Sequence, residues 1–204
     1  MSPTAVIARI RLNPYSRTVQ RDLRDATQMH RTVMRLAPDN LGDSPRRTAG
    51  LLYRVDETTT TSTLLIQGNT LDPSRLPADY GHADLKDLTP MFTALRKGLP
   101  VSYRVEHKGQ RGRIIPLSGP DADQWWMQRA ADAGLQLHVL THTNLDAARP
   151  RGADAASMRH SLIRYDGTAT ITDPDALTQA LLAGIGRGKA YGAGLLSLAP
   201  ARTT

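Results

Sequence analysis

The densest cluster of glycine in the chain lies near its C-terminus, between residues 184 and 194. Five glycines stand in this stretch, and Arg187, Lys189 and Tyr191 lie between them. Glycine has no Cβ and tolerates positive φ, so the backbone can approach a partner closely. Backbone N–H groups flanked by cations suit phosphate oxygens. The pattern therefore predicts a phosphate-binding loop in which Arg187 and Lys189 contact the ligand.

A second basic segment lies near the middle of the chain, where basic residues between 104 and 113 surround two glycines. Such a segment is typical of a hairpin that enters the groove of an RNA stem, and the alternative is a charged hairpin tip without a ligand. We expect Arg111 and Arg113 to contact RNA. Arg159, near the start of a later strand, is a further candidate for an RNA contact.

The chain of 204 residues is basic, with 26 Lys and Arg against 19 Asp and Glu and a net charge of +7. That excess favours a polyanionic partner, of which nucleic acid is the most common. Arginine predominates over lysine, and its guanidinium group matches phosphates and base edges better than an ammonium group does. A high-GC coding bias would also raise the share of arginine, although it does not account for the net charge.

The composition excludes several kinds of site and location. The chain has no cysteine, which rules out disulfides, thiolate zinc sites and cysteine nucleophiles. It lacks the apolar core of a signal peptide, and no run approaches the roughly 18 apolar residues of a membrane span. We therefore expect a soluble, cytoplasmic protein.

Strands and helices alternate in the segments that must position these residues. In the first half we expect a strand at 4–12, a helix from the cap Asp25 to about 37, a hairpin from strands 51–55 and 63–67, and a short helix with a connector at 68–90. In the second half we expect a strand at 100–105, a helix at 125–133 capped by Asp121 or Asp123, a strand at 135–141, a hairpin over 158–172 that turns at Asp166-Gly167, a helix at 174–183 and a strand at 195–198.

The same order of elements in both halves predicts an α+β fold of two tandem ferredoxin-like βαββαβ modules. We place the N-terminal module at residues 1–90 and the C-terminal module, with the basic segment and the glycine-rich loop, at 91–204. Sheets of this kind bind single-stranded RNA in many proteins, usually by stacking bases on aromatic side chains. Aromatic residues make up only 4% of this chain, so contacts by arginine fit better than dense stacking.

The position of the glycine-rich loop argues against a nucleotide-binding enzyme. The loop follows a helix and precedes a strand, which reverses the strand–loop–helix order of dinucleotide sites. It also lacks the Gly-Lys-Ser/Thr ending of a P-loop.

Three segments together resemble one family, the CasE family of CRISPR repeat-RNA endoribonucleases of type I-E systems. They are residues 8–17 with Arg21-Asp22-Leu23, the segment Met29-His30-Arg31-Thr32, and the C-terminal loop leading into 194–200, GLLSLAP. The resemblance implies two ferredoxin-like modules and a metal-independent endoribonuclease without a cofactor. It would cut precursor CRISPR RNA within each repeat, at the base of the hairpin, leaving a 2′,3′-cyclic phosphate and a 5′-hydroxyl. The protein would be a monomer when isolated and would stay bound to the crRNA 3′ hairpin beside other Cascade subunits.

His30 is the candidate catalytic residue under this resemblance. Cleavage without a metal uses the 2′-OH of the RNA as nucleophile, and a histidine with a pKa of about 6.5 can take or donate a proton at neutral pH. Well-known members carry a tyrosine three residues before this histidine, where this chain has Thr27. Tyr15 could approach the site in its place. The alternative is a structural subunit that binds the hairpin with weak or no cleavage.

Three arginines flank His30 in the sequence, at positions 21, 24 and 31. We expect at least one of Arg21, Arg24 and Arg31 to contact the scissile phosphate, with Arg31 in the catalytic group. The alternative is a solvated basic helix face.

Overall fold

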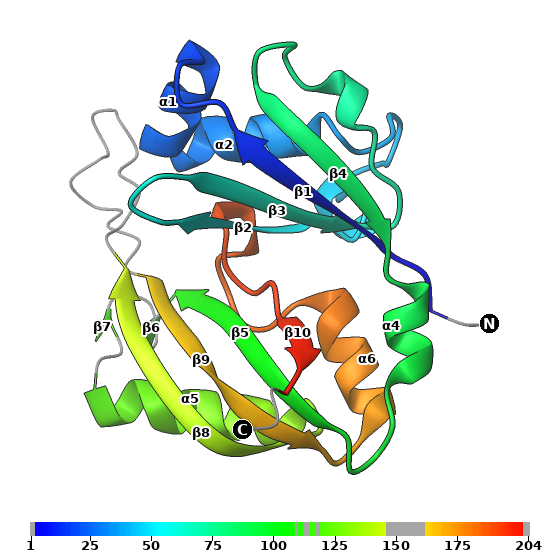
Figure 1. Ribbon diagram of the computed structural model, residues 1–204, viewed down its shortest axis with the longest axis vertical. Coiled ribbons are helices and arrows are strands. Elements are labelled where there is room, and N and C mark those ends of the chain that lie inside the picture. The colour runs from blue at the N-terminus through cyan, green and yellow to red at the C-terminus, as the bar shows by residue number, and fades with distance from the viewer. Residues whose placement is uncertain (1–2, 109, 112–114, 117–118, 146–161, 202–204) are drawn as a thin grey trace.

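The computed structural model describes residues 3–108, 110–111, 115–116, 119–145 and 162–201. Two four-stranded antiparallel sheets lie one above the other, each with helices packed against it (Figure 1). In the described part of the chain, every helix is too short or too polar to cross a membrane.

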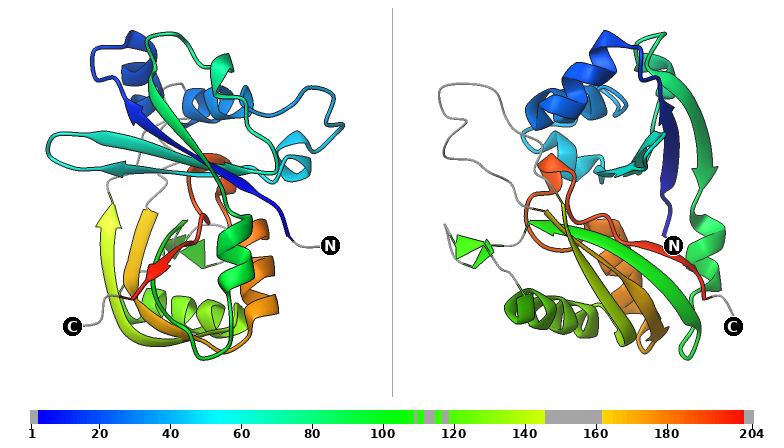
Figure 2. Two further views of the ribbon diagram at one scale, coloured as in Figure 1. Left: turned by 45° about the vertical axis from the view of Figure 1, so that its right-hand side comes forward. Right: turned by 60° about the vertical axis from the view of Figure 1, so that its left-hand side comes forward.

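The N-terminal sheet has the strand order β2-β3-β1-β4. Its strands are β1 (Val6–Leu12), β2 (Leu52–Glu57), β3 (Ser62–Gly68) and β4 (Gly81–Asp87). Helices α1 (Arg17–Arg24) and α2 (Ala26–Met34) cover one face (Figure 2), and α3 (Pro45–Thr48) and η1 (Pro73–Arg75) lie in connections. Alternation along β1 buries Ala8, Ile10 and Leu12 under the helices and leaves Arg9 and Arg11 exposed on the other face.

The C-terminal sheet has the strand order β10-β5-β9-β8. Its strands are β5 (Pro100–Lys108), β8 (Leu135–Leu145), β9 (Leu162–Ile171) and β10 (Ser197–Pro200), with helices α5 (Gly119–Asp132) and α6 (Pro174–Ala183). A small ribbon of β6 (Gln110–Arg111) and β7 (Ile115–Pro116) follows β5, and η2 (Lys189–Tyr191) lies in the glycine-rich loop.

Both sheets place the first strand of the module between its third and fourth strands, which is the ferredoxin-like order. The predicted α+β fold of two tandem ferredoxin-like modules is therefore confirmed. In the N-terminal module, η1 occupies the place of the second helix. The boundary at residue 90 stays a prediction, and α4 (Thr89–Ala94) spans it.

Helices α1 and α3 and strand β4 of the N-terminal module were missing from the sequence prediction. Helix α1 begins after Ser16, whose side chain accepts a hydrogen bond from the Val19 N–H. Its apolar face is thin because the buried positions are Val19 and a charged residue, Asp22. Strand β4 was read as a connector because it is an edge strand with mostly exposed residues. Pairing with β1 therefore determines β4 more than its own sequence pattern does.

The predicted hairpin at Asp166-Gly167 is wrong, because residues 162–171 form one continuous strand, β9. Gly167 pairs with Tyr103 on one side and Leu140 on the other. A Cβ at this position would overlap the Val139 carbonyl oxygen and lie 2.7 Å from the Tyr103 hydroxyl oxygen. The glycine therefore permits close packing inside the sheet and does not form a turn.

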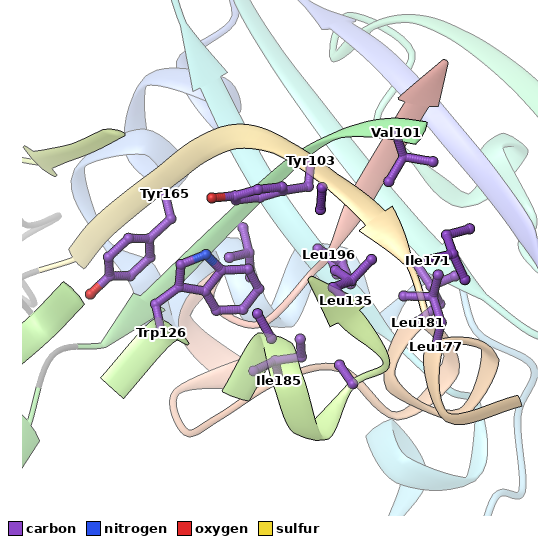
Figure 3. Close-up of a cluster of buried hydrophobic side chains, with 14 of the residues drawn as sticks. Val101, Tyr103, Trp126, Leu135, Tyr165, Ile171, Leu177, Leu181, Ile185 and Leu196 are labelled. Atoms are coloured by element: carbon purple, nitrogen blue, oxygen red, sulfur yellow. The ribbon is translucent and has the colours of Figure 1, made fainter. Parts of the chain in front are cut away.

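Helix α5 begins at Gly119, so neither Asp121 nor Asp123 caps it as predicted. Asp121 lies in the first turn, where its negative charge interacts favourably with the positive end of the helix dipole. On the same helix, the ring of Trp126 is fully buried between Tyr103 and Tyr165 (Figure 3). Ile185 and Leu196, at the two ends of the glycine-rich loop, belong to this core. The loop is thus anchored in the C-terminal module.

Ion pairs join the two sheets through the carboxylate of Asp56 on β2. It pairs with Arg54 on the same strand at 2.9 Å, with Arg164 on β9 at 3.4 Å and with Arg104 on β5 at 3.5 Å. Arg54 also donates to the residues that follow the glycine-rich loop, namely the Leu195 carbonyl at 3.3 Å and the Ser197 hydroxyl at 3.1 Å. The chain after the loop is therefore held against the N-terminal sheet.

Candidate active site

His30 lies in the middle turn of helix α2, and hydrogen bonds before and after it in the sequence hold this helix in place. Asp25 caps the helix, as predicted, and its carboxylate accepts hydrogen bonds from the Thr27 N–H at 2.8 Å and the Gln28 N–H at 3.3 Å. Thr32 donates to the buried carboxylate of Asp22 on α1 at 2.6 Å. These contacts fix the rotation of α2, and so they set the direction of the His30 side chain.

The glycine-rich loop packs against α2 through η2, although the two lie at opposite ends of the sequence. The Tyr53 hydroxyl on β2 donates to the Ala190 carbonyl at 2.9 Å. Gly188 and Gly192, with φ of 83° and 82°, turn the chain sharply before and after η2, a conformation that other residues adopt only with strain. The loop predicted to bind phosphate and the helix that bears His30 therefore form one site.

The electrostatics of this site favour a neutral histidine beside cations. Burial, followed by the charge of Arg46, lowers the pKa of His30 below its ordinary value. Burial, followed by the charges of Arg46 and Arg47, also lowers the pKa of Lys189. Arg46 is therefore near both groups, and the site favours the neutral form of His30. The Nδ1 atom of His30 is buried and has no hydrogen-bond partner among the described residues.

Arg46 and Arg47 were missed by the sequence analysis. They lie in the short helix α3, which Pro45 opens at its first turn. Arg46 donates to the Leu51 carbonyl at 3.0 Å, which directs its side chain back toward β2. The adjacent arginines after Ser44-Pro45 were a visible signal, but their distance from His30 in the sequence concealed their role.

Ion pairing separates structural arginines from those able to bind a ligand. Arginines paired with a carboxylate are Arg9, Arg21, Arg54, Arg75, Arg104, Arg129 and Arg164. Among the residues that the structure describes, no ion pair is formed by Arg17, Arg24, Arg31, Arg35, Arg46, Arg47, Arg187 or Lys189. This second group lies on or beside α1, α2, α3 and the glycine-rich loop. Arg11, Lys86, Arg96 and Lys97 also lack an ion pair in the described ranges, but they lie on β1, on β4 and in the connection between α4 and β5.

The predicted site residues are not all brought together. Arg24, Arg31 and Arg187 are exposed, and the half-exposed Arg21 side chain pairs with Asp22 at 2.7 Å. Tyr15 is 89% exposed, and no hydrogen bond or ring contact joins its side chain to His30 in the described part of the chain. Arg111 lies in β6. Arg113 and Arg159 lie outside the described residues.

Comparison with known proteins places this arrangement among CRISPR proteins. A family model described as CRISPR associated protein matches residues 7–200. The CRISPR-associated endoribonuclease Cse3 of Thermus thermophilus is 26% identical over 212 residues, which cover 95% of this chain and 99% of that protein. Its structure bound to an RNA representing a pre-cleavage complex covers 97% of this chain and 100% of its own, at 25% identity and a TM-score of 0.81.

Two further relatives are named for a complex. The CRISPR system Cascade subunit CasE of Escherichia coli is 24% identical over 193 residues, which cover 87% of this chain and 93% of that protein. A chain from a CRISPR RNA-guided surveillance complex in a pre-nicking state is 37% identical, with a TM-score of 0.70 and coverage of 96% of this chain and 100% of that chain.

Proposed function

Because the chain belongs to the CRISPR associated protein family, we propose that it is an endoribonuclease that cuts precursor CRISPR RNA within its repeats. After cleavage it stays bound to the crRNA 3′ hairpin as a Cascade subunit. Two relatives, one named an endoribonuclease and one a Cascade subunit, support this proposal.

The observation that carries the proposal is a neutral histidine among cations that have no carboxylate partner in the described structure. His30 lies on the helix that packs against the glycine-rich loop, and the charge of Arg46 acts on both His30 and Lys189. A neutral imidazole can accept a proton, and nearby cations stabilise negative charge that develops on a phosphate. A proton acceptor and stabilising cations, two of the groups that RNA cleavage by an internal nucleophile uses, thus lie on elements that pack together.

In the mechanism we propose, His30 takes the proton of the 2′-OH next to the scissile phosphate. The 2′ oxygen attacks phosphorus, and Arg46 and Arg187 stabilise the charge of the pentacoordinate phosphorane. The bond from phosphorus to the 5′ oxygen then breaks, and the Lys189 ammonium, made more acidic by burial, donates a proton to that oxygen. The products are a 2′,3′-cyclic phosphate and a 5′-hydroxyl, and the reaction uses no metal ion.

Further RNA contacts are assigned to the arginines of α1 and α2. Arg31, directly after His30 on α2, contacts the phosphates beside the scissile bond, with Arg21 and Arg24 on the neighbouring helix. Arg111, Arg113 and Arg159 remain candidates for contacts to the RNA stem. Tyr15 stays a candidate for the catalytic group only if RNA binding brings its exposed ring to His30.

Single-turnover cleavage of the repeat RNA from the same genome, in EDTA, tests the reaction. We expect wild-type protein to cut, His30→Ala to bind but not cut, and His82→Ala, a matched change at an exposed histidine paired with Asp84, to cut normally. RNA with a 2′-deoxy group at the cleavage position should bind and stay intact. Cleavage of that RNA, or full activity in His30→Ala, would refute the mechanism.

A structural subunit that binds the hairpin without cutting is the second candidate. It is favoured by Thr27, which is exposed three residues before His30 and cannot replace a tyrosine in proton transfer. Intact RNA at saturating wild-type protein, with tight hairpin binding, would establish this alternative.

A further inference from the structure

Each of the packed helices α1 and α2 carries a row of exposed arginines. Arg17, Arg21 and Arg24 share one stripe of α1, because residues three or four apart lie on the same helix face. Arg31 and Arg35 form a second stripe at the solvent side of α2. We call these five residues the arginine face.

The arginine face carries no exposed acidic residue on either helix. The acid within α1, Asp22, is buried. Asp25, between the helices, accepts hydrogen bonds from the first N–H groups of α2 as its cap. Except for Arg21, the arginines of the face form no ion pair with the described residues. Cations clustered in this way repel one another, and a polyanion relieves that repulsion.

The arginine face is on a different side of α2 from His30. Successive residues of an α-helix are rotated by about 100°, so Arg31 lies about 100° and Arg35 about 140° around the axis from His30. Helix α1 docks still further around in the same direction, because Thr32, about 200° from His30, donates to Asp22. The cations therefore lead from the catalytic side of α2, over its solvent side, to α1.

An RNA that contacts both His30 and the arginine face must bend around a single helix. The diameter of an α-helix with its side chains is about 10 Å. Double-stranded nucleic acid is stiff over far greater lengths, whereas a single strand can follow so tight a path. The hairpin stem therefore cannot occupy both surfaces.

Tyr15 adds a second feature suited to a single strand. Tyr15 is 89% exposed and comes two residues before Arg17, the first arginine of the α1 row. Exposed aromatic rings stack on unpaired bases, which a duplex does not offer. An arginine row that tracks phosphates, headed by an aromatic ring, is the combination found in sites for single-stranded nucleic acid.

We propose that the arginine face and Tyr15 bind the single-stranded RNA that flanks the repeat hairpin at the cleavage site. This inference rests on the proposed function, because it takes the hairpin to be bound at the glycine-rich loop. The face would hold the flank during cleavage, and its exposed cations would release that flank more readily than the half-buried Lys189 and Arg46 release the hairpin.

Binding measurements with 2′-deoxy RNA, which remains intact, test the proposal. The probes are the repeat hairpin alone, the hairpin with a 3′ single-stranded extension, and the hairpin with a 5′ extension. Each phosphate contact on a single strand contributes about 0.7 to the slope of log K against log salt. In Arg17→Gln/Arg35→Gln we expect the slope for one extended RNA to fall by about 1.4, and its affinity at 0.1 M salt to fall about 25-fold. Affinity for the bare hairpin should not change. The extended RNA whose affinity falls shows whether the arginine face binds the 3′ or the 5′ flank.

The matched control is Arg75→Gln/Arg129→Gln, which removes the same charge from exposed arginines that are paired with acids. It should change binding of all three RNAs little. A second variant, Tyr15→Leu, should weaken only the same extended RNA. Equal losses for the bare hairpin and the extended RNA, or no loss for either extension, would overturn the proposal. Cleavage by wild-type protein is measured separately, so failure of the proposed function would be seen on its own.

Discussion

Replacing Asp56 by asparagine should destabilise the protein more than replacement of an acid in an exposed ion pair does. Asp56 joins Arg54, Arg104 and Arg164 across the two sheets. The Arg54 side chain is only 3% exposed, so it cannot replace a lost carboxylate by water. Asparagine has almost the same shape but no charge, and the change therefore isolates the electrostatic contribution.

The expected loss follows from the burial of the partners. Breaking a buried ion pair costs about 3–5 kcal/mol. Here Arg54 keeps its bonds to Leu195 and Ser197, and asparagine keeps one acceptor oxygen. We therefore expect a loss of about 2–3 kcal/mol in the free energy of unfolding. For a chain of this length, that loss lowers the melting temperature by about 4–12 °C.

Urea unfolding and calorimetry of both proteins would measure this loss. The matched control is Asp132→Asn, because Asp132 and its partner Arg129 are both 49% exposed and such a pair contributes about 0–1 kcal/mol. A loss at Asp56 that is below about 1 kcal/mol, or no larger than the control, would refute the view that this carboxylate holds the two sheets together.

Three further predictions concern the glycine-rich loop and its neighbours. Burial, with a smaller effect of Arg129, lowers the pKa of His107 to about 3. Below pH 6.5 the unfolded chain therefore binds more protons than the folded chain, and stability decreases as the pH decreases. His107→Phe removes this effect, and its free energy of unfolding relative to wild type should rise by about 2 kcal/mol between pH 7 and pH 5; an unchanged difference would contradict the assignment. Arg46→Met removes one cause of the lowered His30 pKa, so the acidic limb of the single-turnover rate should move to higher pH, and an unmoved limb would exclude Arg46 from the site. Gly186 has a φ of 75°, and an added Cβ would lie 2.5 Å from His107 Nδ1. Gly186→Ala should therefore lose about 2 kcal/mol in urea unfolding, more than Gly42→Ala, where φ is 70° and the space is open.

Local sequence signals were sufficient for much of the fold. Asp25 marks the start of α2, and Pro174 marks the start of α6, as predicted. Such caps act within a few residues, so they can be read without knowledge of the rest of the chain. The repeated order of strands and helices then predicted the two ferredoxin-like modules.

The tertiary structure decided the features that depend on contacts between residues far apart in the sequence. Gly167 resembles a turn residue in the sequence, but pairing with strands on both sides places it inside a sheet. The sequence shows many arginines, whereas only the folded chain shows which have a carboxylate beside them. Arg46 joins His30 and Lys189 because α3, α2 and the glycine-rich loop pack together. Local patterns thus determined many of the elements, and the resemblance to a family indicated the candidate histidine. Packing between elements decided the membership of the site, because charge and burial depend on neighbours in space.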